Sequence, residues 1–146
     1  MIRKELIAVN KKLEGRFEAI QAMVELVAEA ELISDKESFY QAVLAREDET
    51  VTSIGYQVAI PHGKSSTVKE PFVVFVKTAL PFLWDERNGE EVNIIFLMGI
   101  PEEKGANVHL KVLSQLSRNL MNEDFREKLQ QCETEEAAYQ LLSRIS

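Results

Sequence analysis

His62 is the residue of this sequence best suited to chemistry, because of its type and its immediate neighbours. It is one of only two histidines among 146 residues, and it lies in the run VAIPHGK at positions 58–64. Pro61 fixes its own φ and favours extended backbone at Ile60, while Gly63 permits a sharp turn or a close approach to a ligand. These residues predict a short strand that ends by presenting one imidazole to solvent.

The chemistry that this imidazole suggests is phosphoryl transfer. A neutral imidazole is a nucleophile near pH 7, because the free side chain has a pKa of about 6.5. Phosphoryl transfer asks a protein mainly to position the group and to surround its oxygens with positive charge or N–H donors, and Gly63, Lys64 and Ser65 could offer successive backbone N–H groups. We therefore interpret His62 as a nucleophile that carries a phosphoryl group. An ordinary surface histidine at the end of a strand is the alternative.

Two further residues could complete a phosphate site. His109 lies two residues after Asn107, a candidate helix N-cap, and four before Leu113, so it falls on the buried stripe of that helix. The N-terminal end of a helix favours a nearby anion. Arg46 lies near the end of another predicted helix, sixteen residues before His62, and could bind phosphoryl oxygens in a bidentate manner. The alternatives are a half-buried histidine bonded to a carbonyl and an arginine that satisfies the dipole of its own helix.

Other chemistries fit the residue spacing less well. A P-loop needs a glycine five residues before its last glycine, and Val58 stands there. Two histidines without a cysteine cluster are too few ligands for zinc, so no metal and no cofactor is expected, although a zinc-dependent hydrolase is kept as a third hypothesis. Cys132 is the only cysteine, which precludes an internal disulfide and indicates an ordinary thiol.

Two helices are predicted before the His62 segment. The first begins at Phe17, and its apolar side is expected to consist of Phe17, Ile20, Val24 and Val27. The sequence Ser-Asp-Lys-Glu at 34–37 is typical of a capping box, with Ser34 as the N-cap of a second helix that ends near residues 46–49. The acidic residues 47–49 are expected to form a solvated face.

Strands are predicted after the His62 segment. Residues 72–76 and 92–98 are apolar on both faces, as interior strands are, and Asn88-Gly89 between them is a turn signal. Residues 79–84 contain Pro81, which indicates an irregular or edge segment. Gly99 and Pro101 are expected to stop the second strand.

Helices are predicted again at the C-terminal end of the chain. Leu113, Leu116 and Leu120 have helical spacing, and Thr134 is a candidate N-cap of the last helix. Helices before and after a set of hydrophobic strands imply an α/β fold, a three-layer α/β/α sandwich around a central sheet. The length suits a single domain over residues 1–146.

The charge balance limits the partners that this chain could have. Seventeen basic and twenty-four acidic residues give a net charge of −7 with both histidines neutral. This charge argues against non-specific binding to nucleic acid or to an anionic membrane, although it allows attraction to a basic protein. The sequence has no signal-peptide pattern and no apolar run long enough to cross a membrane, so we expect a cytoplasmic protein with no membrane insertion.

Three parts of the sequence together resemble one known family. The run GYQVAIPHGK at positions 55–64 is similar to the Gly-x-x-(Ile/Val)-Ala-(Ile/Val)-Pro-His-Gly signature of the enzyme IIA domain of the bacterial sugar phosphotransferase system, in its mannitol–fructose class. Arg46-Glu47 stands at the family's spacing before the active histidine, and His109 with the leucines at 110, 113 and 116 resembles the family's second-histidine helix. The resemblance covers nearly the whole chain.

The resemblance implies a fold and a role for each candidate residue. The fold is a mixed sheet flanked by helices. His62 would take a phosphoryl group from the phosphohistidine of the carrier HPr and pass it to a cysteine of a IIB domain, which phosphorylates the incoming sugar. His109 would stabilise the phosphorylated state, and Arg46 would bind phosphoryl oxygens. The family also has regulatory members that signal through their phosphorylation state, and the pair Tyr56-Gln57 leaves the sugar branch open.

Overall fold

The computed structural model describes residues 2–102 and 106–144, and within the second range the side chains of residues 106–110, 112 and 113 lie outside the description. The first half of the chain forms η1 (Lys4–Leu6), β1 (Ile7–Lys11), α1 (Arg16–Glu29), α2 (Lys36–Glu49), β2 (Ser53–Gly55), β3 (Val58–Ala59) and β4 (His62–Ser65). The second half forms β5 (Phe72–Asp85), β6 (Glu90–Pro101), α3 (Ala106–Leu120), α4 (Glu123–Gln131) and α5 (Glu135–Leu142). Helices therefore precede and follow most of the strands.

The strands form one mixed sheet in the order β1-β5-β6-β3-β2, and β4 also pairs with β6. The long strands β5 and β6 form an antiparallel hairpin at the centre, and β1 lies parallel to β5. Strands β3 and β4 both run parallel to β6 along its other edge, where β3 pairs with Ile94 and Ile95 and β4 pairs with residues 98–101. This arrangement places the start of β4, and so His62, beside the middle of the sheet.

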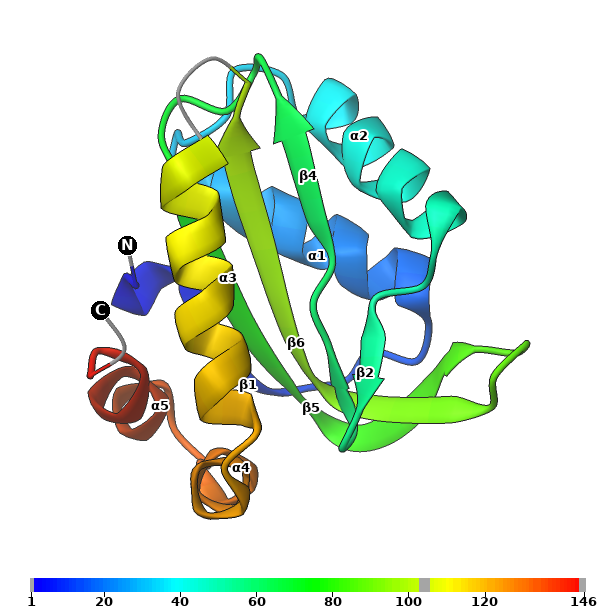
Figure 1. Ribbon diagram of the computed structural model, residues 1–146, viewed down its shortest axis with the longest axis vertical. Helices are drawn as coiled ribbons and strands as arrows, with labels where there is room; N and C mark the ends of the chain where they lie inside the picture. The colour runs from blue at the N-terminus through cyan, green and yellow to red at the C-terminus, as the bar shows by residue number, and fades with distance from the viewer. Residues whose placement is uncertain (1, 103–105, 145–146) are drawn as a thin grey trace.

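Helices cover both faces of this sheet (Figure 1). Helices α1 and α2 lie on one face, where Ile20 and Val43 pack against Val74 of β5 in one apolar cluster. Helices α3, α4 and α5 belong to the other face, where a second cluster joins Leu116 to Phe96 of β6. The predicted three-layer α/β/α sandwich with a central mixed sheet is confirmed.

The two strands that were predicted as interior strands supply both clusters. On β5, Val74 belongs to the first cluster and Val73 to the second, because successive side chains of a strand point to opposite faces. The rings of Phe75 and Phe96 lie 5.1 Å apart on the second face. Both strands are longer than predicted, and residues 79–84 are part of β5, with a register shift against β6 between Lys77 and Phe82.

The prediction that Gly99 ends a strand is wrong. Strand β6 continues through Gly99 to Pro101, and Gly99 pairs with Phe72 of β5 and with Gly63 of β4. A Cβ atom on Gly99 would lie 2.1 Å from the ring of Phe72. Glycine is therefore needed here because the Phe72 ring covers the strand, and not because the strand stops.

Two predictions about the first two helices are also wrong. The N-cap of α2 is Asp35, whose carboxylate accepts a hydrogen bond from the backbone N–H of Ser38 at 3.0 Å, while the Ser34 hydroxyl donates to the Thr67 carbonyl. Asp35 has the same capping chemistry one residue later. Phe17 is 51% exposed and packs against the guanidinium of Arg16 instead of the core.

The cap of the last helix was predicted correctly. The hydroxyl of Thr134 accepts a hydrogen bond from the backbone N–H of Ala137 at 3.0 Å. Leu116 and Leu120 of α3 are buried as predicted, whereas Asn107 and Leu113 lie outside the described side chains. In the part of the chain that the structure describes, no helix combines the length and the apolar character that crossing a membrane requires.

Candidate functional site

His62 begins a strand instead of ending one. Strand β3 ends at Ala59, and His62 is the first residue of β4, where it pairs with Met98 of β6. Pro61 lies between the two short strands and has no N–H to donate, but its carbonyl accepts a hydrogen bond from the backbone N–H of Met98 at 3.1 Å. The proline therefore interrupts the ladder just before the histidine while the backbone stays bound to β6.

Gly63 shows which way the His62 side chain points. A Cβ atom on Gly63 would lie 2.8 Å from Cγ2 of Val43, so this glycine faces α2 and lets the helix approach the strand closely. His62 neighbours Gly63 and therefore projects from the opposite face of the sheet, the face of its partner Met98 and of α3 (Figure 1). Gly63 makes room for a helix, and not for a ligand as the sequence suggested.

The predicted run of N–H donors at Gly63, Lys64 and Ser65 is not formed. All three residues lie in β4 and pair with β6, and successive N–H groups of a strand point in opposite directions. Ser65 is buried, and its hydroxyl lies 2.9 Å from the hydroxyl of Thr67. Lys64 is exposed and shares the face of His62, since the two are separated by one residue.

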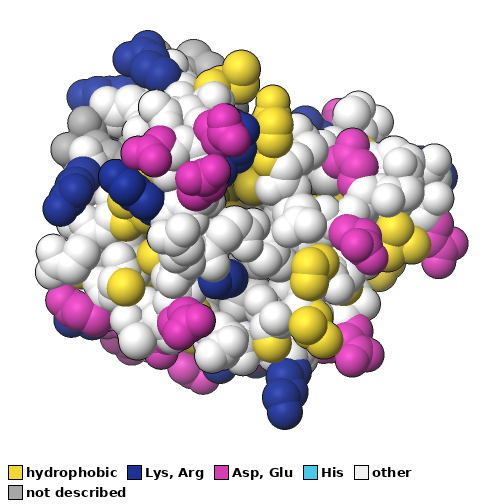
Figure 2. All heavy atoms as spheres, turned by 90° about the horizontal axis from the view of Figure 1, so that it is seen from below, with side chains coloured by type: hydrophobic (Ala, Val, Ile, Leu, Met, Phe, Trp, Pro, Cys, Tyr) yellow, Lys and Arg dark blue, Asp and Glu magenta, His cyan; other side chains and the backbone are white. Residues whose placement is uncertain are grey.

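The hydrogen bond of the His62 ring defines its reactive nitrogen. Nδ1 lies 3.0 Å from the carbonyl oxygen of Ile60. A carbonyl oxygen only accepts hydrogen bonds, so Nδ1 carries the proton and Nε2 carries the lone pair of the neutral ring. The ring is half-buried, and among the described side chains no histidine is visible on the face shown in Figure 2. The candidate nucleophile is therefore Nε2. The ring is not exposed on the face of the molecule that Figure 2 shows.

Arg46 lies in the last turn of α2, three residues after the Val43 that contacts Gly63. Residues three apart share one side of a helix, so Arg46 is on the side of α2 that faces β4. Its Nη1 donates a hydrogen bond to the carbonyl of Thr50 at 2.8 Å. This bond takes one of the five N–H donors of the guanidinium.

His109 lies in α3, seven residues and about two helical turns before the buried Leu116. Its backbone therefore belongs to the helix that covers the same face of the sheet as His62. The side chain of His109 lies outside the described residues. Its pairing with His62 stays a prediction.

Glu47 is a buried residue that the sequence reading placed on a solvated face. It is 1% exposed, and it accepts a hydrogen bond from the hydroxyl of Thr52, which is itself 4% exposed. Its other oxygen lies 3.5 Å from Nη1 of Arg16. One signal could have identified it, since Glu47 follows the core residue Val43 by four positions and so lies on the buried side of α2.

The remaining candidate chemistry was assigned to Cys132 and to metals. Cys132 is buried at the end of α4, its thiol donates to the carbonyl of Lys128 at 3.3 Å, and burial raises the pKa of the thiol. A raised pKa lowers the thiolate fraction and therefore the reactivity of the sulfur. Among the side chains that the structure describes, no group of three His, Cys, Asp or Glu residues is placed to hold a metal ion.

Comparison with known proteins decides the family. The family model described as the phosphoenolpyruvate-dependent sugar phosphotransferase system, EIIA 2, matches residues 1–145. The chain belongs to this EIIA family. It is a phosphoryl-transfer component of the phosphotransferase system, as the resemblance of its sequence implied.

Relatives of this EIIA chain fall into two functional groups. It is 32% identical over 141 residues to the fructose-specific EIIA component of Haloferax volcanii, covering 97% of this chain and 91% of the relative. It is 36% identical over 145 residues to a nitrogen regulatory protein of Bradyrhizobium diazoefficiens, covering 98% and 92%. The crystal structure of the nitrogen regulatory protein IIA-Ntr from Neisseria meningitidis is 27% identical and superposes with a TM-score of 0.87, covering 96% and 94%.

One solved structure with this fold is a complex. Enzyme IIA mannitol of Escherichia coli, determined together with phosphorylated enzyme IIB mannitol, is 22% identical to this EIIA chain and superposes with a TM-score of 0.82, covering 99% of this chain and 98% of that one. The complex partner is a property of that protein, and the superposition shows that the two chains share their fold.

The pair that leaves the sugar branch open lies in a hairpin turn of this EIIA chain. Tyr56 and Gln57 connect β2 to β3 with φ angles of 58° and 63°, a left-handed conformation that Asn and Gly adopt more readily. The guanidinium of Arg126 in α4 lies 3.8 Å from the centre of the Tyr56 ring, and the carbonyl of Gln57 accepts hydrogen bonds from the backbone N–H groups of Asn93 and Ile94. Contacts from α4 and β6 thus stabilise an unfavourable turn six residues before His62.

Proposed function

We propose that this EIIA chain, acting as a single domain over residues 1–146 in the cytoplasm, accepts a phosphoryl group from phospho-HPr on His62 and passes it to a cysteine of a IIB domain for sugar uptake. The observation that supports this proposal best is the hydrogen bond from His62 Nδ1 to the Ile60 carbonyl, because it leaves the lone pair on Nε2. The chain also belongs to a family of phosphoryl-transfer proteins.

In the first transfer, one P–N bond forms to His62 as one P–N bond to the HPr histidine breaks. The Nε2 lone pair of His62 attacks phosphorus, a new P–N bond forms, and the P–N bond of phospho-HPr breaks with its electron pair returning to the HPr histidine. The Nδ1 proton of His62 stays in place, and its hydrogen bond to the Ile60 carbonyl stabilises the positive charge that develops on the ring. The ring needs no separate base, because the attacking nitrogen is already unprotonated.

Arg46 and His109 are proposed to act on the transferred group. Arg46 would bind phosphoryl oxygens with guanidinium donors beyond the one that contacts Thr50, and so reduce the charge repulsion around phosphorus. His109 would stabilise the phosphorylated state from the first turns of α3. In the second transfer a thiolate of the IIB domain attacks phosphorus, and the P–N electron pair returns to Nε2 of His62.

A labelling experiment tests this proposal. Incubation with enzyme I, HPr and labelled phosphoenolpyruvate should give an adduct that is labile to acid and stable to base, as a phosphohistidine is. His62→Ala should take up no label. Normal uptake by His62→Ala would show that another residue carries the group. A chase with a panel of IIB domains then identifies the acceptor and, with it, the sugar branch.

A second candidate function is regulation, and the similarity to nitrogen regulatory proteins favours it. The nitrogen regulatory protein of Bradyrhizobium diazoefficiens is 36% identical to this chain and the fructose-specific relative 32%, while the IIA-Ntr structure is 27% identical. In this candidate function, phosphorylation of His62 controls binding to a regulated partner, and no sugar is moved. Rapid transfer from the phosphorylated chain to any IIB domain would contradict it, whereas labelling of His62 without transfer to the panel would favour it.

A further inference from the structure

The segment Thr50–Thr52 is bonded to Arg46 directly and to His62 through Ile60. The carbonyl of Thr50 accepts the hydrogen bond from Arg46 at 2.8 Å. The carbonyl of Thr52 accepts a hydrogen bond from the backbone N–H of Ile60 at 3.0 Å, and the carbonyl of Ile60 in turn accepts the Nδ1–H of His62 at 3.0 Å. The backbone of Thr50–Thr52 together with that of Ile60 therefore connects the guanidinium of Arg46 with the imidazole of His62.

Glu47 holds this segment from inside the protein. Its carboxylate accepts a hydrogen bond from the Thr52 hydroxyl, and both side chains are almost completely buried. A buried carboxylate is costly unless it is hydrogen-bonded or paired with a positive charge, and a hydrogen bond to such a charge is stronger than a neutral one. Glu47 therefore has a strong preference for this one arrangement of Thr52.

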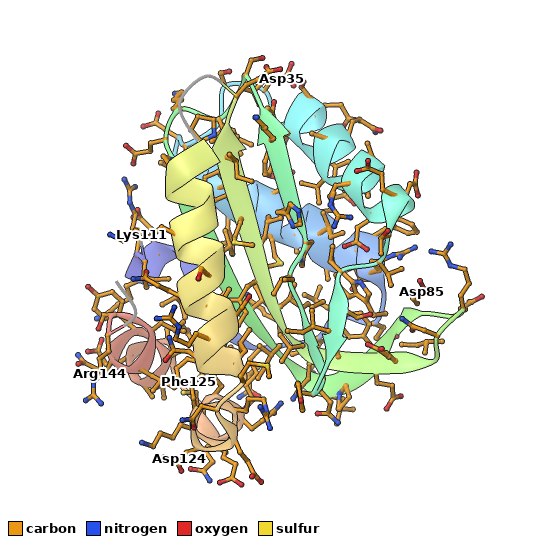
Figure 3. All side chains as sticks on the ribbon, in the orientation of Figure 1. Asp35, Asp85, Lys111, Asp124, Phe125 and Arg144 are labelled. Carbon is orange, nitrogen blue, oxygen red and sulfur yellow. The ribbon has the colours of Figure 1, made fainter. Side chains whose placement is uncertain are left out.

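Glu47 is also paired with the guanidinium of Arg16, which in turn lies near the carboxylate of Asp85. Nη1 of Arg16 lies 3.5 Å from Glu47 and 3.9 Å from Asp85. Asp85 also accepts two side-chain hydrogen bonds from Arg87, at 3.2 and 3.1 Å, and one from its backbone N–H. Figure 3 shows Asp85 at the β5–β6 hairpin, on the opposite side of the molecule from Asp124 and Phe125 of α4. The carboxylates of Glu47 in α2 and Asp85 at the end of β5 thus meet at the guanidinium of Arg16, at the start of α1.

We propose that Glu47 is a positioning residue, which fixes the tautomer of the His62 ring and the place of Arg46 through Thr52. The inference rests on the proposed function. In this scheme Glu47 does not contact phosphorus or any reacting atom. It acts on His62 through the backbone carbonyls of Thr52 and Ile60. When its hydrogen bond to Thr52 is lost, the Ile60 carbonyl is held less firmly, and Nε2 competes with Nδ1 for the ring proton.

The test combines a spectroscopic and a kinetic measurement on the full chain. The ¹⁵N chemical shifts of the His62 ring report which nitrogen is protonated, and labelled phospho-HPr gives the rate of phosphoryl acceptance. We expect Glu47→Gln and Thr52→Val each to shift the ring toward a mixture of tautomers and to lower the acceptance rate about tenfold, because a misplaced reacting group loses the advantage of orientation. Thr52→Ser keeps the hydroxyl and should restore most of the rate.

The controls separate positioning from folding and from charge. Glu49→Gln makes the same chemical change on an exposed residue of the same helix, and it should leave tautomer and rate unchanged. The double variant Glu47→Gln/Thr52→Val should be no slower than Thr52→Val alone, since Glu47→Gln only weakens the hydrogen bond that Thr52→Val removes. Thr52→Val removes only the hydroxyl, and it tests the inference even if Glu47→Gln does not fold.

The outcomes distinguish this inference from the proposed function. A slower rate with an unchanged tautomer, or a changed tautomer with an unchanged rate, would overturn the positioning role. If the wild-type chain accepts no phosphoryl group, the proposed function fails, and the ring shifts of the unphosphorylated variants alone decide the inference. An unchanged tautomer in both Glu47→Gln and Thr52→Val would then overturn it.

Discussion

The two faces of the sheet attach their helices in different ways. On the α2 face, the helix approaches β4 closely at Gly63, and a buried charged group, Glu47, accepts a hydrogen bond from Thr52 near Arg46. On the α4 face, the side-chain amides of Asn93 and Gln130 form two hydrogen bonds with each other, at 2.7 and 2.8 Å.

The two attachments differ in whether their hydrogen bonds connect to the proposed site at His62 and Arg46. The amide pair is neutral and satisfies its own donors and acceptors, so it fixes α4 to β6 without reaching the site. Lys77 of β5 adds to this attachment by donating to the carbonyls of Gln130 and Cys132 at the end of α4. The α2 attachment is charged, and its bonds lead to Arg46 and His62. We therefore expect changes on the α2 face to affect phosphoryl transfer and changes on the α4 face to affect stability alone.

The largest effect is expected for Gly63→Ala, on the α2 face. The added Cβ would lie 2.8 Å from Cγ2 of Val43, so α2 must move, and overpacking of this kind costs about 2 to 3 kcal/mol. The movement carries Arg46 away from β4, so the rate of phosphoryl acceptance should also fall about tenfold. Urea denaturation and the phospho-HPr assay measure the two effects.

The double variant Gly63→Ala/Val43→Ala is the matched control for this prediction. Removing the Val43 methyl groups makes room for the new Cβ, so stability and rate should both recover part of the loss. If the effects of the two substitutions simply add, the contact with Val43 is not the reason for the glycine.

An intermediate effect is expected for Asn93→Ala, on the α4 face. The substitution leaves the half-buried amide of Gln130 without its partner, which costs about 1 kcal/mol of unfolding free energy. The rate of phosphoryl acceptance should stay at the wild-type value. Gln131→Ala removes an exposed amide from the same turn of α4 and should change neither quantity. A slower rate in Asn93→Ala would mean that the α4 face also communicates with the site.

The smallest effect is expected for Arg87→Gln, and it depends on pH. The side-chain hydrogen bonds from Arg87 hold the pKa of Asp85 below its ordinary value of 3.8. A lowered pKa in the folded state adds stability above the ordinary pKa, and this stability is lost as the pH falls through the lowered value. Wild type should therefore be more stable than Arg87→Gln at neutral pH, and the difference should disappear in acid. A difference that persists below both pKa values would indicate another origin.

Much of the fold could be predicted because its signals are local. The apolar run at 72–76 forms the first part of β5 and the run at 92–98 the middle of β6, and Ile20, Val24 and Val27 form the buried side of α1. Such patterns reflect the periods of strands and helices, which each segment expresses without help from the rest of the chain. His62 was proposed in the same way, from its immediate neighbours.

The failures share one cause, which is contact between residues distant in the sequence. Ser34 and Asp35 are both good caps, and only the geometry of the loop selects Asp35. Gly63 is typical of a turn or of a ligand site, and only the approach of Val43, twenty positions earlier, gives it another role.

By itself, the sequence determined the class of fold and the EIIA family and singled out His62 as the candidate nucleophile, because periodic patterns and a short signature lie within single segments. Only the tertiary structure decided which nitrogen of His62 holds the proton and that Glu47 is buried. Both depend on partners contributed by other segments: the carbonyl of Ile60 is fixed by Thr52, and the carboxylate of Glu47 meets Arg16 from the start of α1. A charge is stable inside a protein only when the fold brings such partners to it.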